Sequence, residues 1–156
     1  MKTKVTIAAI IQARMNSTRF PGKVMSSLID KSMLEFQIER IKKCPSINEI
    51  IIATTKNNAD EIICEMAKKL SIKFFRGDEK DVLLRYYEAS KLSEADTLVR
   101  FTADCPLIDP IIIEEVISLF KSNNVDYVSN INPPSFPDGL DVEVFSYNSL
   151  LQANKF

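Results

Sequence analysis

The sequence predicts an α/β domain with a largely parallel β-sheet. Strand-like and helix-like segments alternate four times along the chain, which is the pattern of parallel strands joined by crossover helices. One apolar run, residues 49–55 (E-I-I-I-A-T-T), is continuous, as in a strand that is covered on both faces. The chain has 156 residues, of which 46% are hydrophobic and 26% charged, so we treat residues 1–156 as a single domain.

The first half of the chain contains two predicted helices between apolar strands. Residues 5–11 form the first strand, and residues 72–75 form the third. Ser32 with Glu35 three residues later is the pattern of a capping box, which starts a helix that ends at Pro45. The second helix is expected to have Asn58 as its N-cap, Asp60 and Glu61 in its first turn, and Ile62, Ile63, Met66, Ala67 and Leu70 on its buried face.

Two helices of the second half have clear sequence signals. A helix over residues 81–93 is predicted to have Leu83 on its apolar side and Arg85 on the opposite side. Asp109 followed by Pro110 is the pattern of an N-cap and a first helical residue, and this helix extends to about residue 121. The remaining predicted elements are strands over residues 97–102, 126–130 and 140–145 and a helix that starts at Ser146.

Composition and charge exclude several classes of function. The net charge of −1 gives no general attraction to nucleic acids or membranes, and no apolar stretch approaches the length of a membrane-spanning helix. We therefore expect a cytoplasmic protein without nucleic-acid or membrane partners. Three widely spaced cysteines indicate neither a disulfide framework nor a zinc site. Because the sequence has no histidine, catalysis must use carboxylates, lysine, arginine or a metal held by oxygen ligands.

A loop with three cations follows the first strand directly, and we refer to residues 13–23 as the cation loop. Arg14, Arg19 and Lys23 lie in it with no acidic residue between them. Ligands of parallel sheets bind just beyond the carboxyl ends of the strands, and guanidinium and ammonium groups suit phosphate oxygens. The loop fits neither G-x-x-x-x-G-K-[ST] nor G-x-G-x-x-G, and a solvated surface is the alternative interpretation. We predict that it binds a polyphosphate.

Carboxylates follow two later strands. Asp104 comes just after the strand over residues 97–102, at the same sheet edge as the cation loop, where Mg²⁺ would bridge the protein and bound phosphates. The alternative for Asp104 is a cap on the turn at Pro106. Asp141 and Glu143 alternate with apolar residues and are expected on one face of a strand. That face is either exposed to solvent or a wall that binds the hydroxyl groups of an acceptor.

Five blocks of the sequence together resemble the cytidylyltransferase family. In order they are A-R-M-N-S-T-R-F-P-G-K, A-T-T, G-D-E-K-D-V-L-L-R-Y-Y-E-A, R-F-T-A-D-C-P-L-I-D-P and D-G-L-D-V-E-V-F. The family includes CMP-Kdo and CMP-sialic acid synthetases, and the blocks look most similar to its SpsF-type branch of spore-coat polysaccharide proteins. The resemblance covers essentially the whole chain. It implies a Rossmann-like, three-layer nucleotide-diphospho-sugar transferase fold.

The resemblance also implies an activity, the transfer of CMP from CTP to a sugar acid with release of pyrophosphate in surface polysaccharide or glycan biosynthesis. It implies Mg²⁺ as cofactor, CTP and a small sugar acid as partners, and a homodimer. The candidate catalytic residues are Arg14, Lys23 and Asp104, with Asp104 as the metal ligand. The candidate nucleotide-binding residues are Ala13, Arg14, Ser17, Arg19, Lys23, Arg100 and Thr102, and the candidate substrate-binding residues are Asp81, Arg85, Asp141 and Glu143.

Two departures from the family pattern leave alternatives open. Thr102-Ala103-Asp104 stands where the Kdo enzymes carry a Gln-Gly-Asp-type segment. Family members also extend well beyond this length, so we expect the chain to be truncated at its C-terminus. One alternative is a glycosyltransferase of the related nucleotide-sugar fold, although Asp104 lacks the usual Asp-x-Asp partner. The other is a nucleotide-binding module without activity, and pyrophosphate release separates the first interpretation from both.

Overall fold

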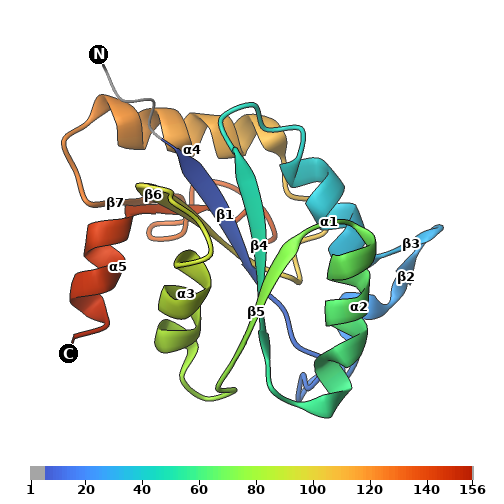
Figure 1. Cartoon of the computed structure of the whole chain (residues 1–156). Coiled ribbons are helices and arrows are strands. Elements are labelled where there is room, and N and C mark those ends of the chain that lie inside the picture. Colours follow the sequence, from blue (N-terminus) through green and yellow to red (C-terminus); the bar gives the residue numbers. More distant parts are fainter. Residues whose placement is uncertain (1–5, 156) are drawn as a thin grey trace.

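The computed structural model describes residues 6–155 and is built around one six-stranded β-sheet (Figure 1). The predicted α/β class with a mostly parallel sheet is confirmed. Val5, which the sequence assigns to the first strand, lies outside the described residues. The strands are β1 (Ile7–Gln12), β4 (Glu49–Thr55), β5 (Lys73–Gly77), β6 (Thr97–Thr102), β7 (Tyr127–Ser129) and β8 (Glu143–Ser146).

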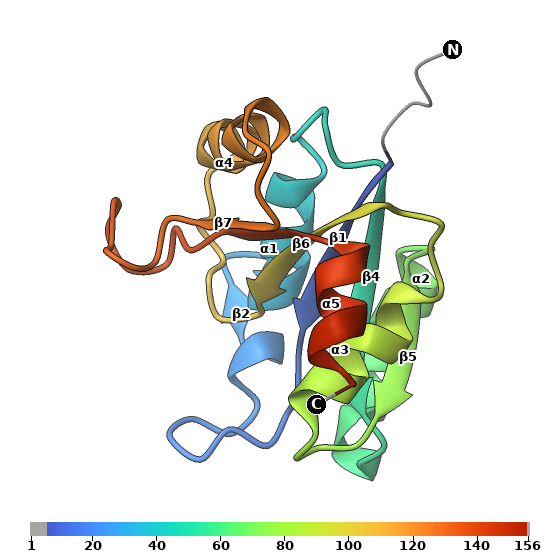
Figure 2. The same ribbon diagram turned by 90° about the vertical axis from the view of Figure 1, so that its left-hand side faces the viewer.

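The strand order is β5-β4-β1-β6-β8-β7, and β8 runs antiparallel to both of its neighbours. Helices cover both faces of this sheet, which gives three layers. On one face lie α1 (Met33–Ile41), α2 (Glu61–Lys69) and α4 (Pro110–Ser122), and on the other lie α3 (Val82–Ser90) and α5 (Tyr147–Ala153). Figure 2 shows α3 and α5 side by side. Over residues 6–155, the helices lack the combination of length and apolar character that crossing a bilayer requires.

The central strand β1 is buried on both faces. Ala8 and Ile10 point toward α3 and α5, whereas the residues next to them in sequence point toward the other three helices. The parallel registers place Gln12 beside Ala53 of β4 and Thr102 of β6. The carboxyl ends of these three strands therefore meet at one edge of the sheet, and the loops that follow them are neighbours.

Three predicted helix starts are confirmed. Ser32 and Glu35 form the capping box of α1. Asp109 accepts a main-chain N–H at the start of α4, with Pro110 as the first helical residue. Ser146 caps α5 in the same way. Each cap joins residues only two or three positions apart, which is why the local sequence predicts it.

The predicted start of the second helix is wrong. Asn57 precedes a 3-10 turn, η2 (Asn58–Asp60), and α2 begins only at Glu61. Asp60 precedes α2 instead of lying in its first turn; it is 1% exposed, and its carboxylate accepts hydrogen bonds from Met15 and Thr55. Ile62 was expected on the buried face but is 44% exposed.

The predicted sides of α3 are also wrong for two residues. Arg85 is buried, and Leu83 is 43% exposed. The guanidinium of Arg85 points inward because it donates to the main-chain carbonyls of Asp78 and Glu79. These hydrogen bonds offset part of the cost of removing the charged group from water.

Three further differences concern strands. Because β8 begins at Glu143, Asp141 precedes the strand and the two carboxylates do not share a strand face. The third strand was predicted over residues 72–75, but β5 extends to Gly77. A hairpin of β2 (Ser27–Leu28) and β3 (Lys31–Ser32) extends from the right of the molecule in Figure 1. Strands of two residues are too short for periodicity to predict them.

Candidate active site

A cavity of about 720 Å³ opens at the sheet edge where β1 and β6 end. Three segments that are far apart in the sequence line it: the cation loop, the turn after β6, and the loop between β7 and β8. The structure thus brings the three cations of the loop together with Asp104 and Asp141. The predicted site residues that line the cavity are Arg14, Ser17, Arg19, Lys23, Thr102, Asp104 and Asp141.

Hydrogen bonds within the cation loop close it on itself. The carbonyl of Met15 accepts the N–H of Ser17 at 2.9 Å and the N–H of Gly22 at 2.8 Å. Gly22 has a φ of +76°, a left-handed conformation that favours glycine, and it precedes the 3-10 turn η1 (Lys23–Met25). The closed loop therefore directs the side chains at both of its ends into the same cavity.

Lys23 and Asp104 meet in the cavity. Lys23 Nζ donates to Asp104 Oδ2 at 3.0 Å, although the two residues are 81 positions apart in the sequence. Partial burial raises the pKa of Asp104, but hydrogen bonds from Thr102 and Lys23 outweigh it, so the pKa lies below its ordinary value. Asp104 is therefore ionised at neutral pH and can bind a cation.

Asp138 and Asp141 form an acidic wall of the cavity. Asn130, which is buried, holds this loop in place: its side chain donates to the carbonyl of Leu140 at 2.7 Å and accepts the N–H of Val142 at 2.8 Å. These two bonds fix the residues on either side of Asp141. Partial burial, followed by the neighbouring carboxylates, raises the pKa of Asp141.

The oxygen donors in the cavity fit a magnesium ion that is shared with phosphates. Mg²⁺ usually takes one or two carboxylates and completes its shell with phosphate and water. Asp104 supplies such a carboxylate, while Arg14 and Lys23 line the same cavity as candidate phosphate contacts. Among residues 6–155, no cluster of three or more His, Cys, Asp or Glu side chains encloses a metal position by itself. The site therefore suits a cation held jointly by the protein and a nucleotide.

Arg100 and Glu143 lie outside this cavity. They form an ion pair and line a second cavity of about 530 Å³ between α3, α5 and the sheet. Tyr127 donates its hydroxyl to Glu143 at 3.0 Å, and the guanidinium of Arg100 lies 5.5 Å from the ring centre of Tyr86. This placement separates the predicted nucleotide contact Arg100 and the predicted substrate contact Glu143 from Asp104 and the cation loop.

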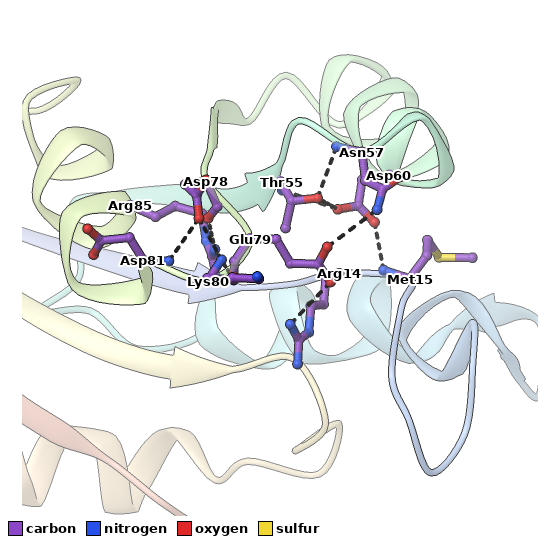
Figure 3. A network of polar contacts seen from close by, with 10 residues as sticks. All are labelled: Arg14, Met15, Thr55, Asn57, Asp60, Asp78, Glu79, Lys80, Asp81 and Arg85. Carbon is purple, nitrogen blue, oxygen red and sulfur yellow. Dashed lines mark hydrogen bonds and ion pairs between the residues drawn. The ribbon is translucent and has the colours of Figure 1, made fainter.

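Asp81 and Arg85 also lie outside the cavity, yet their sequence block contacts the cation loop (Figure 3). Asp81 caps α3 by accepting the N–H of Leu84 at 2.9 Å, and Arg85 supports the preceding turn from inside. On that turn, Glu79 Oε1 accepts a hydrogen bond from Arg14 Nη1 at 3.4 Å. The block therefore acts on the cavity through Glu79, which the sequence reasoning did not single out.

Other supporting residues were also missed. Gln37 of α1 is buried and donates to the carbonyl of Thr102 at 2.8 Å, which holds the end of β6.

Ala13, a predicted nucleotide contact, is buried beside the cavity and donates its N–H to the carbonyl of Ala53 at 3.2 Å. Most lining residues that the sequence reasoning did not assign fall inside the five blocks, which is the signal that would have found them. Inside the blocks lie Thr18, Ala103, Cys105, Asp138 and Gly139, whereas Gln12 and Val24 flank the first block.

Fold and site together define a class of protein. A three-layer α/β sheet that presents cations and a carboxylate at the carboxyl ends of its parallel strands has the Rossmann-like nucleotidyltransferase fold. A solved cytidylyltransferase structure from Leptospira borgpetersenii superposes with a TM-score of 0.92 and 35% identity. The match covers 97% of this chain and 65% of that one.

Sequence comparison identifies the family within this class. Residues 8–155 match the family model described as cytidylyltransferase. An uncharacterized protein of Methanocaldococcus jannaschii is 42% identical over 96% of this chain and 60% of its own length. The spore coat polysaccharide biosynthesis protein SpsF of Bacillus subtilis is 30% identical over 96% of this chain and 62% of its own length. The chain belongs to the cytidylyltransferase family.

A 3-deoxy-manno-octulosonate cytidylyltransferase of Geobacter metallireducens is also similar, with 34% identity over 72% of this chain and 43% of its own length. The chain therefore spans about three fifths of the length, or less, of these curated relatives.

Proposed function

We propose that this chain transfers CMP from CTP to a hydroxyl group of a small sugar acid and releases pyrophosphate. The observation that carries the proposal is the contact of Lys23 with Asp104 in a cavity that Arg14 and Arg19 also line. Three cations suit a triphosphate, and the ionised carboxylate beside them suits Mg²⁺. Family membership supports CTP as the donor. The similarity to SpsF and to a 3-deoxy-manno-octulosonate cytidylyltransferase supports a sugar-acid acceptor and a role in surface polysaccharide or glycan biosynthesis.

The transfer needs charge neutralisation and alignment more than covalent help. Arg14, Arg19 and Lys23 hold the triphosphate, and Lys23 stabilises the negative charge that develops on the leaving pyrophosphate. Mg²⁺, when held by Asp104, supplies further neutralisation of the phosphate charge. The acceptor oxygen forms a bond to the α-phosphorus while the bond from that phosphorus to the bridging oxygen of the β-phosphate breaks. The sequence without histidine is compatible with this direct displacement.

Asp141 is the residue we assign as acceptor of the hydroxyl proton. It lies in the cavity wall, and its raised pKa makes it a stronger base than an ordinary aspartate. Asp138 on the same wall contributes hydrogen-bond acceptors for the other hydroxyl groups of the substrate. The acidic wall and the cation loop thus divide the cavity into an acceptor side and a phosphate side.

Pyrophosphate release with CTP, MgCl₂ and a panel of sugar acids tests the proposal. We expect release that depends on an acceptor and falls by about 10²-fold or more in Asp104→Asn, because one preorganised charged contact is lost. Asp109→Asn is the matched control: it makes the same chemical change outside the cavity and keeps a residue that caps α4.

CTP binding without pyrophosphate release from any acceptor would contradict the transfer and indicate a nucleotide-binding module. Release of a nucleoside diphosphate from a nucleotide sugar, without pyrophosphate, would instead indicate a glycosyltransferase. Equal activity of Asp104→Asn and Asp109→Asn would remove Asp104 from the mechanism.

A further inference from the structure

Asp60 is a buried carboxylate that the mechanism above does not use. Its side chain is 1% exposed. Oδ1 accepts the N–H of Met15 at 2.7 Å, and Oδ2 accepts the N–H of Thr55 at 3.2 Å together with the Thr55 hydroxyl. Figure 3 shows these contacts between the end of β4 and the start of the cation loop. The two oxygens thus join the cation loop to the end of β4, although Met15 is 45 positions from Asp60 in the sequence.

The position of Asp60 in its own helix does not explain these contacts. Asp60 immediately precedes α2, but its side chain forms no capping hydrogen bond with that helix. Burying a carboxylate is unfavourable unless hydrogen bonds satisfy it, and bonds from N–H groups to an ionised oxygen are stronger than neutral ones. The partners that satisfy this carboxylate are Met15 and Thr55, so its effect falls on the cation loop and on the end of β4.

Met15 is the residue at which the cation loop closes. Its carbonyl accepts the N–H groups of Ser17 and Gly22, so an early and a late residue of the loop are bonded to the same oxygen atom. Arg14 precedes Met15, and Lys23 follows Gly22. Within residues 6–155, the guanidinium of Arg14 is held by a 3.4 Å contact with Glu79, a half-exposed ion pair of the kind that contributes little by itself.

We propose that Asp60 is a positioning residue for the cation loop. By accepting the N–H of Met15, Asp60 holds the backbone of the residue whose carbonyl closes the loop, and so it orients Arg14 and Lys23 before a triphosphate binds. A preorganised loop loses less conformational freedom on binding, which increases affinity. This inference rests on the proposed function in one respect, that the loop binds a triphosphate.

The test compares Asp60→Asn with Thr55→Val. In Asp60→Asn an NH₂ group, which cannot accept, replaces one oxygen; the orientation that keeps both Thr55 contacts turns this group toward the N–H of Met15 and removes that bond. Thr55→Val removes a hydroxyl contact of the same carboxylate and leaves the Met15 bond in place. Calorimetric titration with Mg²⁺-CTP and with inorganic tripolyphosphate measures the affinity. We expect Asp60→Asn to bind both at least about tenfold more weakly and Thr55→Val to remain within about twofold of the natural sequence.

Hydrogen exchange gives a second measurement that needs no ligand. In Asp60→Asn, the amides of Met15, Ser17 and Gly22 should exchange faster than in the natural sequence, and in Thr55→Val they should not. If Asp60→Asn does not fold, Asp60→Glu replaces it, because the longer side chain keeps the charge and displaces Met15.

Two results would overturn the inference. One is a folded Asp60 variant with unchanged triphosphate affinity, and the other is unchanged exchange at these three amides. If the natural sequence binds neither CTP nor tripolyphosphate, the proposed function fails, and the exchange rates still decide whether Asp60 holds the loop.

Discussion

Gly77→Ala tests how closely α3 packs against the end of β5. Gly77 is buried, and a Cβ atom built on it would lie 2.9 Å from Arg85 Cγ and 2.9 Å from Phe75 Cε1. Its backbone is outside the left-handed region, so alanine fits the conformation and only the contacts oppose it. Arg85 cannot move aside easily, because it is 1% exposed and its guanidinium is bonded to the carbonyls of Asp78 and Glu79.

The expected cost follows from this overpacking. Extra carbon in a well-packed site destabilises a protein by about 1–3 kcal/mol, and each kcal/mol lowers the melting temperature of a domain this size by about 2–4 °C. Thermal unfolding followed by circular dichroism should therefore show a melting temperature about 2–12 °C lower for Gly77→Ala. In an Arg85→Ala background the added methyl group should cost less, because the side-chain atom it meets has been removed.

An unchanged melting temperature of Gly77→Ala would refute this account of the packing. The same cost in both backgrounds would show that the contact with Arg85 is not its source.

Three further predictions concern stability and reactivity. Ile29 is 88% exposed and has a φ of +63°, a left-handed conformation that a β-branched residue adopts with strain. Ile29→Asn should therefore raise the free energy of unfolding by about 0.5–1 kcal/mol. A melting temperature of Ile29→Asn at or below that of Ile29→Val would contradict this prediction. Burial, with a hydrogen bond to Glu114, raises the pKa of Cys44 to about 12. A disulfide reagent at pH 8 should therefore modify the Cys44 thiol on the order of 10³-fold more slowly in the folded protein than in the unfolded protein. Equal rates would contradict the raised pKa of the folded-state thiol. Hydrogen bonds from the N–H and hydroxyl of Ser32 lower the pKa of Glu35, so its ionised form stabilises the fold above its ordinary pKa and this stabilisation is lost as pH falls toward the folded-state pKa. In urea titrations, the stability difference between the natural sequence and Glu35→Gln should narrow from about pH 5 to pH 3, and a constant difference would contradict it.

Contacts between residues close in sequence explain what the sequence reasoning predicted correctly. The alternation of strands and helices defines the fold class, and the capping pairs at Ser32 and Asp109 define two helix starts. The cation loop and Asp104 share a sheet edge because both follow parallel strands, and the directions of those strands follow from the alternation. None of these inferences needs knowledge of how distant side chains pack.

The errors arose where a partner lies far away in the chain or where the backbone departs from a regular element. The local sequence of Asp60 indicates an acidic residue in the first turn of a helix, but in the structure its carboxylate accepts the N–H of the distant Met15. Asp141 and Glu143 look like one strand face, yet they line different cavities because β8 starts only at Glu143.

The sequence by itself determined the fold class, the loop that carries the cations, and the chemistry available to the site. Residue types, local caps and strand–helix alternation are properties of short segments, so they can be recognised without knowing how the rest of the chain packs. Only the tertiary structure decided which charged groups meet, namely that Lys23 contacts Asp104 and that Arg100 pairs with Glu143 away from the cavity. Burial and pairing depend on surfaces that come together from distant parts of the chain, and these are set when the sheet assembles.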